Sequence, residues 1–455
     1  MCDVVAGGVT DLFVCPKGLK QGEITSPLLF SLFINEAATD IMKNGMHGVQ
    51  MFPDILEIFI LLFADDVALV SDTPRGLQNQ LDVLARNSDA LDLSVNLDKS
   101  NIIVFRNGGY LASNEHWSFN GQEVAVVNLY KYLGLYFSTR LSFSKAFEEL
   151  ATKARRGVIE IFKVLWKLGD FSPSLFLKMF DSQIKPVLMY ASEVWGMYDH
   201  YTVEKVHLFA LKKLLNVSPC TPNDMAYGET GRYPLYVQAR ANCIRYWQRL
   251  VRMEDERLPH KAYKMLLLLH DSGKDCWATN IRSELYRNGF GLVWENQSVG
   301  NINWFLRVYK QRLIDSFCQD WHSHVNESAR FTVYRHFKSS VYLETYFVDI
   351  TNKHLRDLYI RFRIGASEIQ THKHRYTSDS RHSLQCPLCN SRLEDEMHFL
   401  FFCKKLEALR HRFIPAKYTK FPTYITLNNM FNDGSCLQAV ARYIYYGLKL
   451  RKEVV

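Results

Sequence analysis

Two adjacent carboxylates, Asp65 and Asp66, stand between two short apolar runs and are the residues of this chain best suited to chemistry. The runs cover residues 58–62 and 67–70, and both have the length and the β-branched or aromatic content of strands. The pattern predicts a buried β-hairpin with the carboxylates at its tip. Ionised carboxylates on an apolar support are costly unless a cation neutralises them, and Mg²⁺ suits carboxylates and substrate phosphates. For the dipeptide alone, a solvent-exposed Asp-Asp turn is the alternative.

A glycine-containing segment, GLKQGEITSP at residues 18–27, precedes the carboxylates. Its two glycines allow a ligand to approach the backbone closely. Ser26 is a good N-cap and Pro27 a good first helical residue, so we expect a helix to start there. Taken alone, such a turn before a helix is usually structural.

Two further segments follow the carboxylates. VNLDKSNIIVF at residues 95–105 predicts a turn that carries Lys99 and a strand over 102–105. After a turn at residues 119–121, the segment YKYLG begins another short strand over 130–135. Neither segment is distinctive by itself.

The order and spacing of these four segments resemble the palm of the reverse transcriptases encoded by non-LTR (LINE-type) retrotransposons. GLKQGEITSP resembles the family's motif B, FADD its motif C, VNLDKSNIIVF its motif D, and YKYLG its motif E, the primer grip. The segment IKPVLMYASEVWG at residues 184–196 resembles the region beyond the palm. The resemblance covers roughly residues 1–415. It implies an α+β fold: a partial right-hand polymerase palm of antiparallel sheet plus helices, a helical thumb and connector, and a small zinc knuckle.

The resemblance also implies roles for individual residues. Asp65 would ligate two Mg²⁺ ions, with Asp66 as a weaker or outer partner, and Lys99 would lie near the departing pyrophosphate. A surface lysine in a turn is the alternative reading of Lys99. The remaining implied contacts are to the incoming nucleotide or template (Gln21, Gly22, Ser26) and to the primer backbone (Tyr132, Gly134). An RNA template and a DNA primer are the implied partners.

One part of the family's pattern does not match. The family has a further aspartate on the motif A strand, several dozen residues before motif B, whereas seventeen residues precede Gly18 here. Asp3 and Asp11 are too close to motif B to serve. We therefore expect a sequence without motif A and without fingers, truncated at its N-terminus, that does not polymerise DNA by itself.

A second chemical signal lies near the C-terminus. Cys386, Cys389, His398 and Cys403 form a C-x2-C-x8-H-x4-C pattern. Three thiolates and one imidazole are a closed four-ligand set, typical of structural zinc. Residues 394–396 are predicted to open a short helix with their acidic side chains in its first turn. Four unrelated residues are the alternative, and the segment also resembles the zinc knuckle that follows the polymerase in the same family.

A basic, aromatic-bearing stretch precedes the cysteines. Residues 372–376, followed by Arg381 and His382, suit single-stranded RNA through phosphate contacts and base stacking. A solvated loop explains the same composition. His382 is also a possible competing zinc ligand.

Composition sets broader limits. A net charge of +8 over 455 residues is compatible with a nucleic-acid partner. The other seven cysteines are scattered, which suggests a reducing compartment. With no signal peptide and no apolar run near ~20 residues, we expect an intracellular chain, in the nucleus, the cytoplasm or both, with no membrane segment.

The chain turns helical after residue 142. Val158, Ile161, Phe162 and Leu165 form an apolar stripe with basic residues off it, and Gly169 is a predicted helix end. Further helices are predicted over 173–197, 202–216, 234–253, 301–327 and 437–452. The predicted regions are a partial palm (1–142), a thumb-like region (143–254), a connector (255–370), a zinc-knuckle region (371–415) and a tail (416–455).

Three functional hypotheses remain open from the sequence. The first is an RNA-directed DNA polymerase represented by palm, thumb and knuckle. The second is a remnant or domesticated fragment that binds nucleic acid without catalysis. The third is a relic that folds poorly because an apolar edge of its palm is exposed.

Overall fold

The computed structural model describes residues 22–43, 48–50, 57–168, 172–198, 200–374 and 384–454. The chain divides into two compact units. The first unit consists of Met1–Phe143 with Met253–Ser272, and the second of Ser144–Arg252 with Gly273–Val455. The five regions predicted from the sequence stay predictions about domains.

The first unit combines helices with short antiparallel strand pairs. Its elements are α1 (Ser26–Lys43), β1 (Val49–Gln50), β2 (Glu57–Ile58), β3 (Ile60–Phe63), β4 (Asp66–Leu69), α2 (Pro74–Ala90), β5 (Ser118–Phe119), β6 (Gln122–Glu123), β7 (Leu129–Tyr132), β8 (Leu135–Ser138) and α10 (Leu258–Asp271). The strands pair as β1–β2, β3–β4, β5–β6 and β7–β8. The expected antiparallel pairing is therefore present, but as separate two-stranded sheets in the described residues.

The predicted strand over 102–105 does not form, which is one reason why the strand pairs stay separate. Only Ile102 bridges, to Val126 in the parallel sense, through bonds from Ile102 N to Ala125 O (2.9 Å) and from Val127 N to Ile102 O (2.8 Å). No strand is assigned to residues 103–105. The second predicted strand, over 130–135, is instead a hairpin, because the chain turns at Leu133 and Gly134 between β7 and β8.

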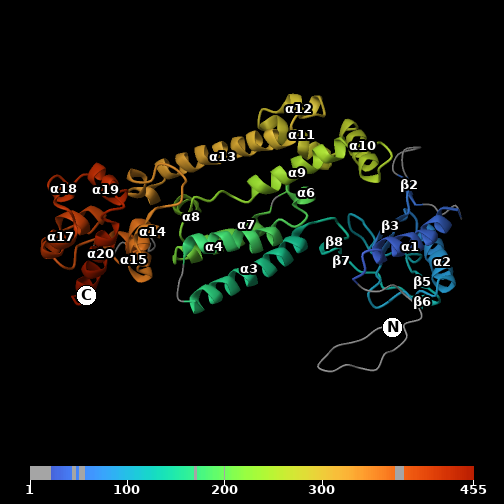
Figure 1. The fold of residues 1–455 in the computed structure, drawn as a ribbon, viewed down its shortest axis with the longest axis horizontal. Coiled ribbons are helices and arrows are strands. Elements are labelled where there is room, and N and C mark those ends of the chain that lie inside the picture. Colours follow the sequence, from blue (N-terminus) through green and yellow to red (C-terminus); the bar gives the residue numbers. More distant parts are fainter. Residues whose placement is uncertain are drawn as a thin grey trace, which may run out of the picture. The chain divides into compact units, whose positions relative to one another are not determined.

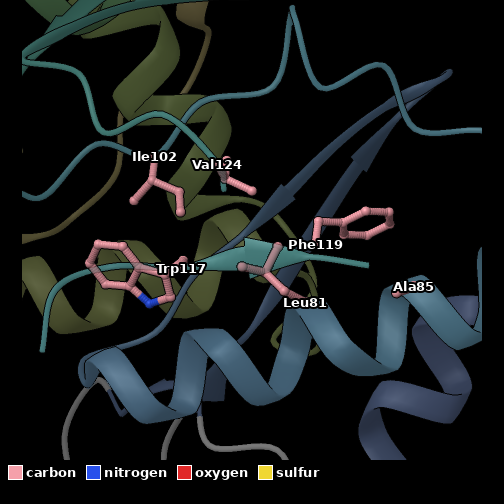
Figure 2. Packing of buried hydrophobic residues seen from close by; sticks show 6 residues of the cluster. All are labelled: Leu81, Ala85, Ile102, Trp117, Phe119 and Val124. Carbon is pink, nitrogen blue, oxygen red and sulfur yellow. The ribbon is translucent and has the colours of Figure 1, made fainter. Parts of the chain in front are cut away.

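One hydrophobic cluster packs most of these pieces together. Its buried members are Leu81 and Ala85 of α2 with Ile102, Trp117, Phe119 and Val124, drawn in Figure 2. Partly buried side chains from three other segments pack against it: Leu69 of β4, Val95 and Leu97 of the loop after α2, and Val126 before β7. The cluster thus anchors β4, the segment before Lys99 and the approach to β7 on one helix.

Polar contacts fix α2 in this cluster. Thr73 caps the helix by accepting from Gly76 N, and Pro74 occupies its first turn. The Gln78 amide donates to Ser118 O (2.9 Å) and accepts from Ser118 N (2.9 Å), and the Trp117 indole donates to Pro74 O. These bonds satisfy backbone groups that burial would otherwise leave unpaired.

Helix α1 begins at Ser26, as the sequence predicts, but its cap differs. Leu29 N bonds to Thr25 O, so Thr25 occupies the residue before the first helical turn and Ser26 lies inside it. Ile34 and Ile41 are buried, whereas Leu28 and Leu32 are each 66% exposed. The described part of the first unit therefore presents an apolar face on α1.

The regular elements of the second unit are all helices in its described residues, with one isolated antiparallel bridge between Thr230 and Leu343. Its elements are α3 (Ser144–Lys167), α4 (Pro173–Met179), η1 (Phe180–Ile184), α5 (Lys185–Leu188), α6 (Ser192–Trp195), α7 (Tyr201–Leu214), α8 (Asn223–Thr230), α9 (Tyr236–Val251), α11 (Trp277–Arg287), α12 (Gly291–Glu295), α13 (Ile302–Glu327), η2 (Ala329–Phe331), η3 (Tyr334–His336), α14 (Tyr346–Asp349), α15 (Lys353–Arg363), α16 (Gln370–His374), η4 (His398–Phe402), η5 (Lys404–Leu406), α17 (Glu407–Phe413), α18 (Ala416–Thr419), α19 (Tyr424–Phe431) and α20 (Leu437–Lys452). None of the described helices has both the length and the hydropathy needed to cross a bilayer.

Most predicted helices of this unit are confirmed, including the last one at Leu437–Lys452. The predicted helix over 173–197 is wrong as a single element. It is broken between α5 and α6, where Ala191 adopts a left-handed conformation with φ of 56°. The apolar stripe of α3 is confirmed, with Val158, Ile161 and Leu165 buried. Gly169 lies outside the described residues. Helix α3 packs along α7, and the long α13 packs against α9 and α8 (Figure 1).

Replacing Leu81 by Ala should destabilise the first unit by about 2–5 kcal/mol, because a buried leucine loses its transfer energy and leaves a cavity. Chemical denaturation followed by far-UV circular dichroism measures this loss. Leu111→Ala is the matched control, since Leu111 is 45% exposed and should change stability little. Equal effects of the two substitutions would contradict the role given to the cluster.

Candidate active and metal sites

The tip of the β3–β4 hairpin carries the two candidate catalytic carboxylates. Phe63 pairs with Asp66, so Ala64 and Asp65 form the turn, with Ala64 at a φ of 52°. The strands themselves are half-buried, but residues 63–66 are exposed, Phe63 to 61%. The hairpin is therefore confirmed and the prediction that it is buried is wrong at its tip, because the short strands bury only their shafts against α2.

The β7–β8 hairpin brings Tyr132 near this tip. Burial raises the pKa of the Tyr132 phenol above its ordinary value, and the negative charge of Asp66 raises it further. Leu133 and Gly134 form the turn with φ of 46° and 84°. Glycine is the residue that adopts such a conformation at least cost. The predicted motif C carboxylate and the predicted motif E tyrosine therefore lie within electrostatic reach of each other.

Lys99 lies in a loop that the same hairpin supports. Its backbone N–H donates to both the carbonyl (3.3 Å) and the side chain (3.2 Å) of Asn96, which closes the turn. The Tyr130 hydroxyl donates to Lys99 O at 3.0 Å. The Lys99 side chain is exposed. The sequence did not predict this bond from Tyr130, because the two residues are 31 positions apart and no short motif links them.

The predicted nucleotide-binding residues precede α1. Gly22 is exposed with a φ of 90°, which explains a glycine there, and Ser26 is the first residue of the helix. Gln21 lies outside the described residues. The predicted roles of these residues remain predictions.

The two carboxylates are candidate ligands for a metal ion, and both are exposed. Oxygen ligands suit Mg²⁺, which takes six of them and commonly keeps waters and substrate phosphates among these. Within the described ranges, no third carboxylate, His or Cys gathers with Asp65 and Asp66 into a group that could hold an ion. Their exposure leaves room for ligands from a substrate or from other parts of a protein.

The second candidate site is a group of four metal-ligating side chains: Cys386, Cys389, His398 and Cys403. Their ligand atoms all lie within 4.8 Å of one another. The Sγ atoms of Cys386 and Cys403 are 4.0 Å apart, and Cys389 Sγ is 3.3 Å from His398 Nε2. Tetrahedral zinc with Zn–S bonds of ~2.3 Å places its sulfurs ~3.8 Å apart. The four residues predicted from spacing are thus brought together, in a geometry that fits such an ion.

Local turns explain how distant ligands meet. Cys386 N bonds to Ser391 O (2.8 Å) and Asn390 N to Cys386 O (2.9 Å), with Asn390 left-handed at a φ of 60°. The Asp395 carboxylate accepts from His398 N at 2.7 Å and starts the helical turn η4, which ends immediately before Cys403. A wide π turn thus separates the last two ligands.

The other acidic residue before this turn, Glu394, has a different role from the one predicted. It is fully buried and lies outside the helical turn, accepting from Arg451 at 2.9 Å and from Gln370 N at 2.8 Å. Its Oε1 is 3.9 Å from Cys386 Sγ. The prediction that Glu394 lies in the first turn of a short helix is wrong, because its carboxylate is buried against Arg451 of α20, 57 residues later.

Helix α20 and Arg410 complete the support of the ligands. Arg410 donates to Cys403 O and to Leu400 O, each at 2.8 Å. Tyr443 of α20 donates to Phe399 O, and Gly447 lies against the Phe399 ring, where any added Cβ would come within 2.7 Å of it. Sequence reasoning missed these residues, since only the folded chain places α20 beside the ligands.

The protonation of the ligands depends on their burial. Burial, followed by the neighbouring Cys386, raises the pKa of the Cys403 thiol to about 12, and burial raises that of Cys386. Burial lowers the pKa of His398, which favours the neutral imidazole that metals bind. Metal binding must therefore displace thiol protons.

The predicted RNA-binding stretch before the cysteines starts inside the core. His372 is 1% exposed, and its Nε2 lies 2.8 Å from Glu396 while its Nδ1 lies 2.7 Å from the Ser367 hydroxyl. His372 therefore serves packing and not an RNA surface. Residues 375–383, with Arg381 and His382, lie outside the described residues.

Comparisons with known proteins identify relatives of the first part of the chain. Residues 4–137 match the family described as "Reverse transcriptase (RNA-dependent DNA polymerase)". The RNA-directed DNA polymerase from mobile element jockey of Drosophila melanogaster is 24% identical over 207 residues, which are 44% of this chain and 22% of that protein.

Two other relatives extend the comparison. The probable RNA-directed DNA polymerase from transposon X-element of the same species is 23% identical over 45% of this chain and 22% of its own length. The Pol polyprotein from the type-1 retrotransposable element R2 of Popillia japonica is 28% identical over 30% of this chain and 23% of its own length. The chain thus matches about a fifth of the length of these relatives.

Purified chain should contain one zinc ion, and Cys389→Ser should lose most of it, since a closed set of four ligands loses a thiolate. Elemental analysis after dialysis against a weak chelator measures the stoichiometry. Cys220→Ser is the matched control, because Cys220 is an exposed free thiol outside the group. Unchanged zinc content in the Cys389 variant would contradict the assignment.

Proposed function

Because this chain is related to the reverse transcriptases of non-LTR retrotransposons, we propose that its first unit is part of the palm of an RNA-directed DNA polymerase. The observation that carries the proposal is the exposed Asp65-Asp66 tip on a hairpin that the core of α2 anchors, with Tyr132 close by. An RNA template and a DNA primer are the proposed partners.

Each predicted site residue has a role in this proposal. Asp65 and Asp66 would hold Mg²⁺, whose charge stabilises the attacking 3′-hydroxyl and the departing pyrophosphate. The exposed Lys99 would offset charge on the pyrophosphate. Tyr132 and the Gly134 turn would contact the primer backbone. Gln21, Gly22 and Ser26 would contact the incoming nucleotide or the template.

Two carboxylates do not complete a two-metal site. The aspartate that bridges the ions in this family, on the strand of motif A, has no counterpart in the sequence. We therefore expect the 455 residues alone not to extend a primer. Joined to a segment that carries the missing aspartate, the same residues should form a working centre.

The proposed role of the Cys/His group is structural. Zn²⁺ would bind all four side chains and leave no open position, so the ion would fold the region and take no part in chemistry. The support from Glu394, Arg410 and α20 fits this role, because it fixes ligands in place.

Asp65→Asn should abolish primer extension in a protein that joins this chain to a relative's upstream palm segment, because a metal ligand loses its charge. We expect a loss of at least about a hundredfold in incorporation on an RNA template. Asp72→Asn is the matched control, removing an exposed carboxylate just after the same hairpin. It should retain activity.

The joined protein also tests the proposal itself. Extension by the 455 residues alone would show that the missing aspartate is not needed. Absence of extension in a joined protein that folds, binds primer–template and keeps Asp65 would contradict the assignment of this hairpin as the catalytic one.

A second candidate function, nucleic-acid binding without catalysis, rests on α3. Its exposed face, opposite the buried stripe, carries Lys153, Arg156, Lys163 and Lys167. Among the ion pairs of the described residues, only Lys163 of this set has an acidic partner, Glu160 at 2.7 Å. Such a basic stripe attracts phosphates whatever the sequence. We name it the basic stripe of α3.

Lys153→Glu with Arg156→Glu should weaken duplex binding and flatten its salt dependence, by roughly 0.9 in the log–log slope for each phosphate that the protein no longer neutralises. Fluorescence anisotropy at several salt concentrations measures both. The control is Arg307→Glu with Arg312→Glu, which makes the same change of charge at two exposed residues of α13. Binding that collapses in Asp65→Ala would contradict a role separate from the hairpin.

A further inference from the structure

Trp166, in the last turn of α3, is one of the most exposed large side chains of the second unit. It is 71% exposed, although tryptophan is usually well buried. Its neighbours Val164 and Leu168 are 48% and 68% exposed. An indole in this setting adds little to the packing of the helix. Its exposure therefore calls for an explanation outside the core.

Three pairs of a cation and an aromatic ring lie along the side of α3 that carries Trp166. The Arg155 guanidinium lies 4.1 Å from the Phe209 ring centroid, and Lys213 Nζ lies 5.1 Å from that of Phe162. Lys353 Nζ lies 5.4 Å from that of Trp166. We call these three pairs the cation–aromatic row.

The row follows one line of the helix surface. Arg155, Phe162 and Trp166 are separated by seven and four residues, which returns each to nearly the same side of a helix with 3.6 residues per turn. The row spans ~16 Å along the axis at 1.5 Å per residue. Its partners come from α7 and α15, which lie in the same unit.

The charges of the row are only partly neutralised. Lys353 is paired with Asp357 at 2.7 Å, so that pair carries no net charge. Arg155 and Lys213 are exposed and have no acidic partner among the ion pairs of the described residues, and the exposed Lys167 adjoins Trp166. Positive charge without an ion-pair partner in the described part of the chain thus lies along the row at Arg155 and Lys213, and Lys167 adds one such charge next to the exposed indole in the sequence.

We propose that the cation–aromatic row binds single-stranded nucleic acid, with Trp166 as a platform on which an unpaired base stacks. Single-strand sites combine cations that follow the phosphates with aromatic rings that take the base faces. A duplex hides its base faces inside the stack, so an exposed indole gains nothing from it. A protein partner would be expected to need an apolar surface and not the surrounding cations.

This site differs from the two proposed above. It belongs to the second unit, whereas the proposed palm residues belong to the first. On α3 it follows a different line from the basic stripe, and the two lines are roughly one-third of a turn apart around the helix. Phe162 and Phe209 are half-buried and also serve packing between α3 and α7. Trp166 is the member whose removal tests ligand binding with least damage to the fold.

The test compares single-stranded with duplex DNA on the full chain. Fluorescence anisotropy with a labelled oligo(dT), and with the matching duplex, gives both affinities for each variant. Trp166→Ala should weaken binding of oligo(dT) by about fivefold or more, while Trp166→Phe keeps most of it, because a ring still stacks. Binding of the duplex should hardly change.

Trp304→Ala is the matched control, since Trp304 is 63% exposed on α13 of the same unit and outside the row. It should leave oligo(dT) binding unchanged. Equal losses in the two tryptophan variants, or unchanged binding in Trp166→Ala, would overturn the proposal. So would an equal loss for duplex and single strand, which would assign the row to phosphate contacts alone. Primer extension plays no part in this test, so the proposed polymerase function can fail without affecting it.

Discussion

One hydrophobic cluster, to which α2 contributes Leu81 and Ala85, holds the parts of the candidate active site together. A continuous sheet fixes its strands through shared backbone bonds, but the strands described here pair only two by two. The hairpin with Asp65 is tied to the rest by Leu69, the loop before Lys99 by Leu97, and the approach to Tyr132 by Val126. All three side chains pack against the same cluster, so this packing, with a few polar links, sets the positions of the site's parts.

Such an arrangement makes the site sensitive to the core. An isolated two-stranded hairpin is marginally stable in water. The β3–β4 and β5–β6 hairpins, which contact α2 through β4 and β5, therefore depend on the apolar area they bury there, and the exposed Asp65 tip contributes nothing to that area. The hydrogen bond from Tyr130 to Lys99 O adds one polar link between segments that the cluster already brings close.

A different kind of interaction stabilises the second unit. Arg363 of α15 lies 3.1 Å from Glu229 of α8 and 2.9 Å from Glu344, and Lys338 pairs with Glu344 as well. All four side chains are buried, and burial followed by the charge of Glu229 raises the pKa of Glu344. Removing one member would leave a buried charge without its partner, which costs more than the intact network gains. The network therefore fixes which helices meet more than it adds stability.

Sequence reasoning succeeded where a local pattern determines the structure. The spacing of Cys386, Cys389, His398 and Cys403 identified a group that the fold brings together, because ligands close in sequence need only short turns to meet. The 3.6-residue period of α3 and the alternation around Asp65 identified a helix and a hairpin. Each of these depends on residues of one short segment, the longest being the 17 positions from Cys386 to Cys403.

It failed where the structure depends on distant partners. Glu394 looked like a helix-start residue, but its partner Arg451 lies 57 residues later. The break at Ala191 was hidden because no glycine or proline marks it. Whether the Asp65 tip is exposed depends on which parts of the hairpin the neighbouring segments cover. A run of apolar residues in the sequence does not show this. The role of Gln21 remains a prediction because Gln21 lies outside the described residues, and the role of Lys99 remains one because no contact of its exposed side chain tests it.

The two candidate metal sites differ in what they need from outside the chain. The Cys/His group brings four soft or imidazole ligands from residues 386–403 to within bonding range of one ion, and its supports come from the same unit. It is complete in itself, and its value to the protein is order. The carboxylate tip offers hard ligands, exposed and too few for the ions that polymerisation requires. Openness is necessary there, because substrate phosphates must supply part of the coordination. The proposed palm role therefore depends on a further carboxylate, whereas the proposed structural metal group has its four ligands within the described residues.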